Sequence, residues 1–202
     1  IELYSCSELL YPEDEMRFSM QFFSLIRHIL FSSCLMAIAS ANPANAQDSW
    51  RDLYRPQTFD GMPCRVMTPL SFAPKTNYPV IVSLHGAGGK GTDNKKQLKD
   101  WNRQLAEKQI RTDFPCYVVA PQADQLWDSE HLRKIKNIIG TLPSADMNRV
   151  YILGHSMGGH GTYIFTQLDP DFFAAAAPSA GSGLRRTEPF IDPEKIKDLP
   201  IW

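Results

Sequence analysis

The sequence has no surplus of charge of either sign. Its 21 lysines and arginines are balanced by 22 aspartates and glutamates, which gives a formal net charge of -1 at pH 7 over 202 residues. Binding to nucleic acid depends on clustered basic side chains that neutralise phosphates, and no basic stripe is present. Nucleic acid is therefore not an expected partner. With 43% apolar residues, the chain can bury one ordinary globular core.

Cysteine is also scarce, with four residues in the chain. Neither a Cys-x-x-Cys pair nor a Cys/His cluster with the spacing of zinc ligands occurs, so no metal site is expected. We expect Cys64 early in an antiparallel strand and Cys116 at the start of a parallel one. Such positions lie at opposite ends of a sheet, beyond the reach of a disulfide, so both are predicted to be buried free thiols.

The sequence also lacks an apolar run long enough to cross a bilayer comfortably. The apolar residues 29–41 follow Met16 and several basic residues, and a small-residue cleavage pattern ends at Ala46. This arrangement predicts a signal peptide over residues 16–46. Residues 1–15 precede any methionine and are interpreted as a non-coding or unstructured leader. The mature protein is therefore expected to be exported, periplasmic or extracellular, with no stable membrane insertion after cleavage.

From about residue 54 onward, extended and helical patterns alternate, and we interpret residues 47–202 as one domain. Short apolar runs rich in β-branched residues are typical of strands buried on both faces, and apolar residues at helical spacing indicate the helices between them. The alternation predicts an α/β fold with a mostly parallel sheet covered on both sides. The expected strands are 54–59, 62–69, 80–84, 117–120, 150–153 and 173–177, and the expected helices are 98–105, 132–142 and 161–168.

The most specific motif is GHSMGG, which centres on Ser156. It fits the pattern G-x-S-x-G of a nucleophile elbow, a strained turn between a buried strand and a helix. The turn tolerates no bulk two residues before or after the serine, which Gly154 and Gly158 provide, and Gly159 allows the helix to pack close to the sheet. The motif predicts Ser156 as a catalytic nucleophile, with the Met157 N–H as one donor of an oxyanion hole.

A second glycine-rich segment, HGAGG, begins at His85 after the first buried strand. A loop with so few side chains lets backbone N–H groups approach a substrate, and we expect the second oxyanion donor to be Ala87, with Gly88 as the alternate. A Walker-type phosphate loop is excluded because Lys90 is followed by Gly91 instead of Ser or Thr. A dinucleotide loop is disfavoured because no acidic residue closes a following strand.

These two motifs, with APQ at residues 120–122 and APSAG at residues 177–181, resemble the α/β-hydrolase superfamily. Within it they look most like secreted esterases of the phospholipase/carboxylesterase and polyhydroxybutyrate-depolymerase-like group, often described as predicted peptidases. The resemblance covers about residues 59–202. It implies an α/β-hydrolase fold, a nucleophile at Ser156 with donors at Ala87 and Met157, and hydrolysis of an ester without metal or organic cofactor.

The proton-transfer half of such a site is not evident. In this superfamily an acid and then a histidine follow the serine, yet His160 is the only downstream histidine, and we expect its ring to pack beside the sheet. The carboxylates at residues 192–198 precede the final apolar stretch 199–202, whereas the acid is expected after the strand that this stretch begins. We therefore expect the domain to be incomplete at its C-terminus, with the acid and the histidine beyond residue 202.

The remaining histidines of residues 47–202 are expected to be structural. His85 and His155 belong to the glycine motifs, where hydrogen bonding within the fold is the favoured role, and His131 is expected to be exposed on a helix. Trp127 is interpreted either as part of a substrate pocket or as a neighbour of Asp128, which would then cap the following helix.

The sequence therefore predicts a serine-dependent carboxylic-ester hydrolase that acts through an acyl-enzyme on Ser156, with a small-molecule or polymeric ester as substrate. The alternatives are a serine peptidase of the same fold and a catalytically inactive hydrolase-fold binding domain. The 202-residue chain by itself is expected to be inactive or nearly so.

Overall fold

The computed structural model describes residues 49–73, 75–181 and 191–202. The chain divides into two units, Ile1–Ala37 and Ile38–Trp202, and every described residue belongs to the second. The leader and signal peptide expected over residues 1–46 thus lie outside the described residues. No described helix combines the length and the apolarity needed to span a membrane.

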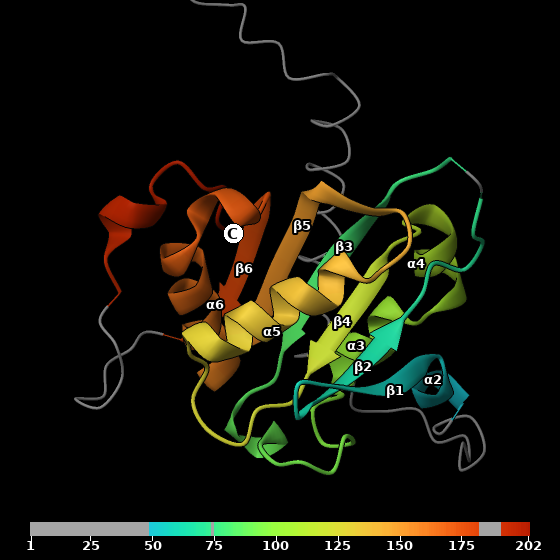
Figure 1. Cartoon of the computed structure of the whole chain (residues 1–202), viewed down its shortest axis with the longest axis horizontal. Coiled ribbons are helices and arrows are strands. Elements are labelled where there is room, and N and C mark those ends of the chain that lie inside the picture. Colours follow the sequence, from blue (N-terminus) through green and yellow to red (C-terminus); the bar gives the residue numbers. More distant parts are fainter. Residues whose placement is uncertain (1–48, 74, 182–190) are drawn as a thin grey trace, which may run out of the picture. The chain divides into compact units, whose positions relative to one another are not determined.

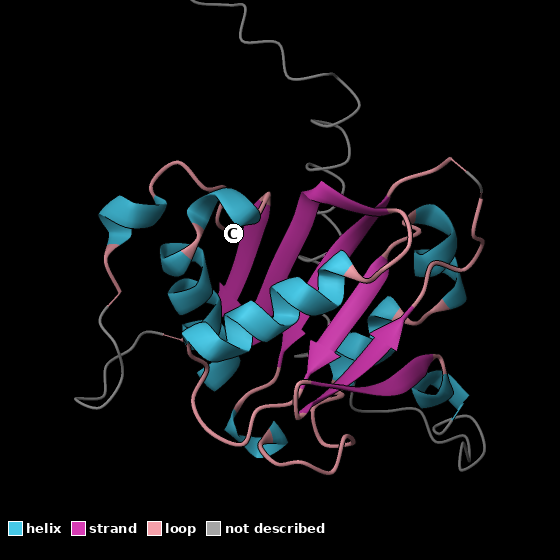
Figure 2. Ribbon diagram, viewed as in Figure 1, coloured by secondary structure: helices cyan, strands magenta, loops and turns pink. Residues whose placement is uncertain are grey.

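The second unit is built around one six-stranded sheet with helices on its faces (Figures 1 and 2). The strands lie in the order β1-β2-β4-β3-β5-β6. β2 pairs antiparallel with both β1 and β4, and the remaining neighbours are parallel. The strands are β1 (Tyr54–Phe59), β2 (Met62–Met67), β3 (Tyr78–Leu84), β4 (Tyr117–Pro121), β5 (Ala145–His155) and β6 (Ala175–Ser179).

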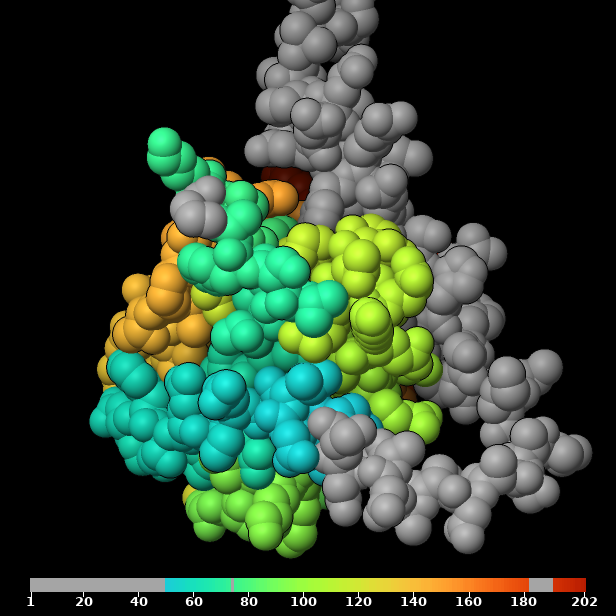
Figure 3. Space-filling view, turned by 90° about the vertical axis from the view of Figure 1, so that its right-hand side faces the viewer, coloured from blue at the N-terminus to red at the C-terminus, as the bar shows by residue number. Residues whose placement is uncertain are grey.

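The central strands are buried on both faces, as their apolar runs predict. Every residue of β3 and β4 is buried, and because side chains alternate along a strand, the two faces receive different residues. Val82 and its neighbours on one face belong to the main apolar core, whereas Ser83 on the other face receives hydrogen bonds from a helix. By contrast, β1 is mostly exposed and forms one edge of the sheet, onto which Figure 3 looks.

The helices cover the sheet in the order that right-handed crossovers require. The path from β3 to β4 runs toward one edge of the sheet, and the paths from β4 to β5 and from β5 to β6 run toward the other. The helices of the first path therefore lie on the face opposite to α5 and α6. The helices are α2 (Ser49–Asp52), α3 (Asp100–Leu105), α4 (Lys108–Asp113), α5 (Ser129–Gly140) and α6 (Met157–Leu168), with three short 3-10 turns, η1 (Ala87–Gly89), η2 (Pro170–Phe172) and η3 (Pro193–Ile196).

This order creates a switch point between β3 and β5. The two strands are parallel neighbours, with Leu84 opposite Gly154 at their carboxyl ends, yet the chain leaves them toward opposite faces of the sheet. In open α/β sheets, ligands bind in the crevice at such a point. Both glycine-rich motifs begin at this position.

Several predicted boundaries are corrected by the structure. The helix expected from Gly161 begins four residues earlier, at Met157, because the glycines that read as loop pack closely against the sheet. The strand expected over residues 173–177 runs over Ala175–Ser179, and α4 was not predicted. In the final stretch, Ile201 forms a single parallel bridge with Ala176 of β6.

The prediction for the two cysteines is confirmed. Cys64 lies opposite Pro121 at the carboxyl end of β4, and Cys116 directly precedes the amino end of the same strand. Both are free and buried. Burial raises the pKa of each thiol to about 12, so neither is a thiolate at neutral pH.

Candidate active site

Ser156 occupies a strained turn between β5 and α6. Its φ of 56° and ψ of -119° are outside the regions that a residue with a side chain normally adopts. Its N–H donates to the carbonyl of Ser179 at the end of β6 (2.8 Å), and its carbonyl accepts from His160 N–H (2.9 Å), so both flanks of the turn are fixed. The residue is exposed, and its hydroxyl does not cap the helix that follows.

Glycine is required on both sides of this turn by close backbone contacts. A Cβ atom at Gly154 would lie 2.3 Å from the carbonyl oxygen of Gly158, and one at Gly158 would lie 2.3 Å from that of Leu84. At Gly159 it would lie 2.3 Å from the carbonyl oxygen of Ser179. These distances are far shorter than van der Waals contact, so the turn and the start of α6 can approach β3 and β6 only without side chains.

The glycine loop after β3 lies directly against this turn. A Cβ atom at Gly86 would be 3.0 Å from the His155 carbonyl oxygen and 3.4 Å from Ser156 Cβ. The next residues form the single turn η1, in which Gly89 N–H donates to the Gly86 carbonyl (2.9 Å). The exposed Ala87 and Gly88 precede this bond, and the first N–H groups of a helical turn have no acceptor within it. Met157 is likewise the first residue of α6.

Three contacts from the β4–α5 connection hold the glycine loop in place. The Ala123 N–H donates to His85 Nε2 (3.0 Å), and the Trp127 indole N–H donates to the His85 carbonyl (3.2 Å). Because Nε2 accepts, Nδ1 carries the ring hydrogen and donates to the Gly86 carbonyl (2.7 Å). Burial lowers the pKa of His85 to about 4, which keeps the ring neutral at physiological pH. His85 is therefore structural, as the sequence indicates.

Gln122 is the third contact, and sequence reasoning did not single out its side chain. The buried amide donates from Nε2 to the Gly89 carbonyl (3.0 Å) and to Asp93 Oδ1 (2.8 Å), and its Oε1 accepts from Asn94 N–H (2.6 Å). One side chain thus joins the glycine loop to the segment that leads toward α3. The sequence signal that could have indicated it is a polar residue placed directly after a predicted buried strand, because buried polar groups need hydrogen-bond partners.

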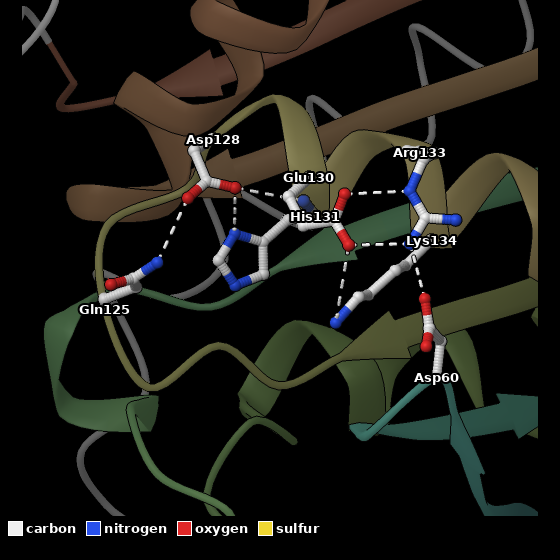
Figure 4. Close-up of polar contacts among 7 residues, drawn as sticks. All are labelled: Asp60, Gln125, Asp128, Glu130, His131, Arg133 and Lys134. Carbon is white, nitrogen blue, oxygen red and sulfur yellow. Dashed lines mark hydrogen bonds and ion pairs between the residues drawn. The ribbon is translucent and has the colours of Figure 1, made fainter.

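The start of α5 shows that Asp128 caps this helix, which is one of the two interpretations of the Trp127–Asp128 pair. Asp128 Oδ1 accepts from the backbone N–H of His131 (3.0 Å) and from its Nδ1 (2.7 Å), and thereby caps the helix. Trp127 is buried, with its ring beside those of His85 and His131. The expectation that His131 is exposed is wrong, because its ring packs against the buried Trp127 while it is hydrogen-bonded to Asp128 (Figure 4).

Polar contacts on the outer side of the same helix turn join α5 to the hairpin of β1 and β2. Arg133 bridges Glu130 of its own helix and Asp60 of the hairpin turn (Figure 4). The Arg133 guanidinium lowers the pKa of Glu130 to about 2, first through its hydrogen bond. These exposed pairs contribute little to stability individually.

No histidine within the described ranges is hydrogen-bonded to Ser156 Oγ. The rings of His85 and His131 have the partners described above, and His155 Nδ1 lies 3.3 Å from Ser179 Oγ. His160 is buried on α6. In the same ranges, no group of three or more His, Cys, Asp or Glu side chains is arranged to hold a metal ion.

Comparisons with known proteins agree with this architecture. No family model and no curated protein matches the chain by sequence. Among solved structures, a thermostable esterase is 34% identical with a TM-score of 0.65, over 76% of this chain and 46% of its own. An S-formylglutathione hydrolase (FrmB) from Staphylococcus aureus is 16% identical with a TM-score of 0.52, over 72% of this chain and 62% of its own. The chain has the α/β-hydrolase fold.

The α/β-hydrolase fold is shared with peptidases as well as esterases. Dipeptidyl peptidase 4 of Porphyromonas gingivalis has a TM-score of 0.52 at 18% identity, over 71% of this chain and 23% of its own. The chain spans less than half of the length of the thermostable esterase and less than two thirds of the length of the hydrolase FrmB. At 16% and 18% identity, the hydrolase FrmB and the dipeptidyl peptidase bear on the fold alone.

Proposed function

We propose that the protein is a serine-dependent carboxylic-ester hydrolase with Ser156 as its nucleophile. The observation that carries this proposal is the strained, exposed Ser156 at the switch point of the sheet, with the glycine loop packed against it. Backbone strain of this kind persists where the surrounding structure enforces it, and it commonly serves a site. The thermostable esterase, at 34% identity, supports ester hydrolysis.

In the proposed reaction, Ser156 Oγ attacks the ester carbonyl carbon and gives its proton to a base. The negative charge that develops on the carbonyl oxygen is stabilised by the N–H groups of Ala87, or alternatively Gly88, and of Met157. Collapse of the tetrahedral intermediate breaks the bond to the alkoxide, which takes up the proton from the base. Water then hydrolyses the acyl-enzyme by the same steps. No metal or organic cofactor takes part in this scheme.

The base in this scheme is a histidine, oriented by a carboxylate, and we propose that both come from outside the described residues. The histidines that the structure describes support this proposal, because they are engaged elsewhere or buried. Residues 1–202 alone are then expected to hydrolyse esters slowly or not at all, whereas the full-length gene product is active. An active 202-residue chain would contradict this part of the proposal.

The decisive test uses the full-length gene product and two serine variants. Ser156→Ala is expected to abolish labelling by a fluorophosphonate and to lower kcat for p-nitrophenyl butyrate by about 10⁴-fold or more, because the nucleophile is lost. Ser129→Ala, which changes an exposed serine at the start of α5, is the matched control and retains both. Labelling that persists in Ser156→Ala would show that another serine is the nucleophile.

Assays of the full-length gene product also distinguish the esterase from a serine peptidase and from a catalytically inactive binding domain. An esterase hydrolyses the p-nitrophenyl ester of an acyl group much faster than the corresponding p-nitroanilide, whereas comparable rates on a peptide p-nitroanilide would favour a serine peptidase. A catalytically inactive binding domain would take up no fluorophosphonate at all.

We also propose that the protein is exported. The signal peptide over residues 16–46 predicts a mature chain that begins at Gln47. Amino-terminal sequencing of the protein from the periplasm or the medium would test this, and a mature form that retains residues 16–46 would contradict it.

A further inference from the structure

Lys99 contacts the glycine loop from the side of α3. Its Nζ donates a hydrogen bond to the Gly88 carbonyl (3.3 Å). No ion pair joins this ammonium group to a carboxylate within the residues that the structure describes. Gly88 is two residues from Gly86, where a Cβ atom would lie 3.4 Å from Ser156 Cβ. A positive charge whose hydrogen-bond partner is a neutral carbonyl therefore lies on the glycine loop that packs against Ser156.

Arg51 adds a second positive charge to the surroundings of Lys99. Burial, and then the positive charge of Arg51, lower the pKa of Lys99, whereas Asp100 raises it. The Lys99 side chain is partly buried and has given up part of its hydration, and the exposed Asp100, next in sequence, is the carboxylate that favours its charged form. An anion that reaches this group would regain some of the lost solvation energy.

Trp101, two residues after Lys99, brings a second aromatic ring close to that of His155, the residue before Ser156. The Trp101 indole N–H donates to Ser83 Oγ (2.9 Å), and its ring centroid is 6.3 Å from that of His155. His155 is exposed and directly precedes Ser156, and its Nδ1 lies 3.3 Å from Ser179 Oγ. A nitrogen atom of each ring lies within hydrogen-bond distance of a serine hydroxyl, which restrains the orientation of both rings.

We propose that Lys99, Trp101 and His155 form a subsite that binds a negatively charged group of the ester substrate. The inference rests on the proposed ester hydrolysis at Ser156 and adds the substrate class, namely esters that carry a carboxylate or a similar anion a few bonds from the scissile carbonyl. The rings border the substrate beside the serine, and the ammonium group pairs with its anionic end.

The test compares two acetate esters that differ in charge but little in shape. 4-Acetoxybenzoate is anionic and 4-acetoxybenzamide is neutral, and kcat/KM is measured for both with the full-length gene product. We expect the wild-type protein to favour the anion, and Lys99→Met to lower the ratio of the two kcat/KM values roughly five- to tenfold, since a charged hydrogen bond is lost. Lys99→Arg, which keeps the charge, should restore most of the ratio. The preference should also weaken at high salt.

Lys95→Met is the matched control, because Lys95 is an exposed lysine of the segment before α3 whose side chain makes no contact with the glycine loop in the part of the chain described. Its ratio should equal that of the wild type. Equal losses on both esters in Lys99→Met would mean that Lys99 only supports the loop, and would overturn the proposal. Absence of fluorophosphonate labelling at Ser156 would instead refute the ester hydrolysis itself, so the two failures are distinguishable.

Discussion

Single glycines determine how close Ser156 comes to the sheet. At Gly158 a Cβ atom would collide with the carbonyl oxygens of both Leu84 (2.3 Å) and His85 (2.8 Å). Both oxygens belong to the main chain at the end of β3, which cannot rotate away as a side chain can. Gly140, at the end of α5, has no atom within 4 Å of the position of such a Cβ.

These two glycines provide a matched pair of variants. Gly158→Ala is expected to lower the free energy of unfolding by about 3 kcal/mol or more, because the added methyl group must push β3 and α6 apart. Gly140→Ala should be neutral or stabilising by up to about 1 kcal/mol, because alanine has the higher helix propensity. Urea denaturation measures both values. Equal effects of the two substitutions would show that the close packing around Gly158 is not as described.

At the scale of the elements, the connection between β4 and α5 supports the site although it contributes no residue to the proposed chemistry. Gln122 and Ala123 bond to the glycine loop, and Trp127 lies beneath it. Asp128 then fixes the first turn of α5. The loop that is proposed to bind the oxyanion is thereby held from the neighbouring strand, independently of any substrate.

Asp128→Ala tests the last of these contacts. Loss of the N-cap should lower the free energy of unfolding by about 1 kcal/mol, and release of the His131 ring should add to this. Asp128→Asn is the control, since asparagine is an equally good N-cap residue and can still accept a hydrogen bond. Thermal or urea unfolding of the two variants checks the difference, and indistinguishable variants would argue against the cap.

The sequence predicted the strands well, and it placed the two glycine-rich segments correctly at the ends of β3 and β5, because both depend on local patterns. It failed where tertiary contacts override local preference. The start of α6 was missed because glycine disfavours helix, and only the contacts of Gly158 and Gly159 with neighbouring strands explain it. The burial of His131 and the three bonds of Gln122 depend on the order of the strands, which periodicity alone does not give.

For the whole molecule, His85 couples stability to pH. Its pKa is about 4 in the folded protein, against an ordinary value of 6.5, mainly because the ring is buried. Between these two values the unfolded chain binds more protons than the folded one, so stability rises with pH in this window and is lost as the pH falls through it. Above pH 6.5 the ring is neutral in both states and contributes no dependence.

We therefore expect the free energy of unfolding to fall by as much as about 3 kcal/mol between pH 6.5 and pH 4 through His85 alone. Urea denaturation at a series of pH values measures this slope. His85→Gln, which does not titrate, should be less stable at pH 7. The free energy of unfolding of this variant should depend less steeply on pH, by the equivalent of up to one proton taken up on unfolding. If His85→Gln leaves this pH dependence unchanged, groups other than His85 cause it.

The pairing of β3 with β5 has a consequence for biosynthesis. Leu84 lies opposite Gly154, which the ribosome adds about 70 residues later, so at typical rates of translation roughly 4–14 s separate the two. During that interval the apolar β3 lacks its neighbour β5, and at first it lacks β4 as well, so the nascent chain exposes apolar surface that chaperones bind. The crevice at Ser156 can therefore form only after the strand that precedes the serine has inserted beside one made about 70 residues earlier.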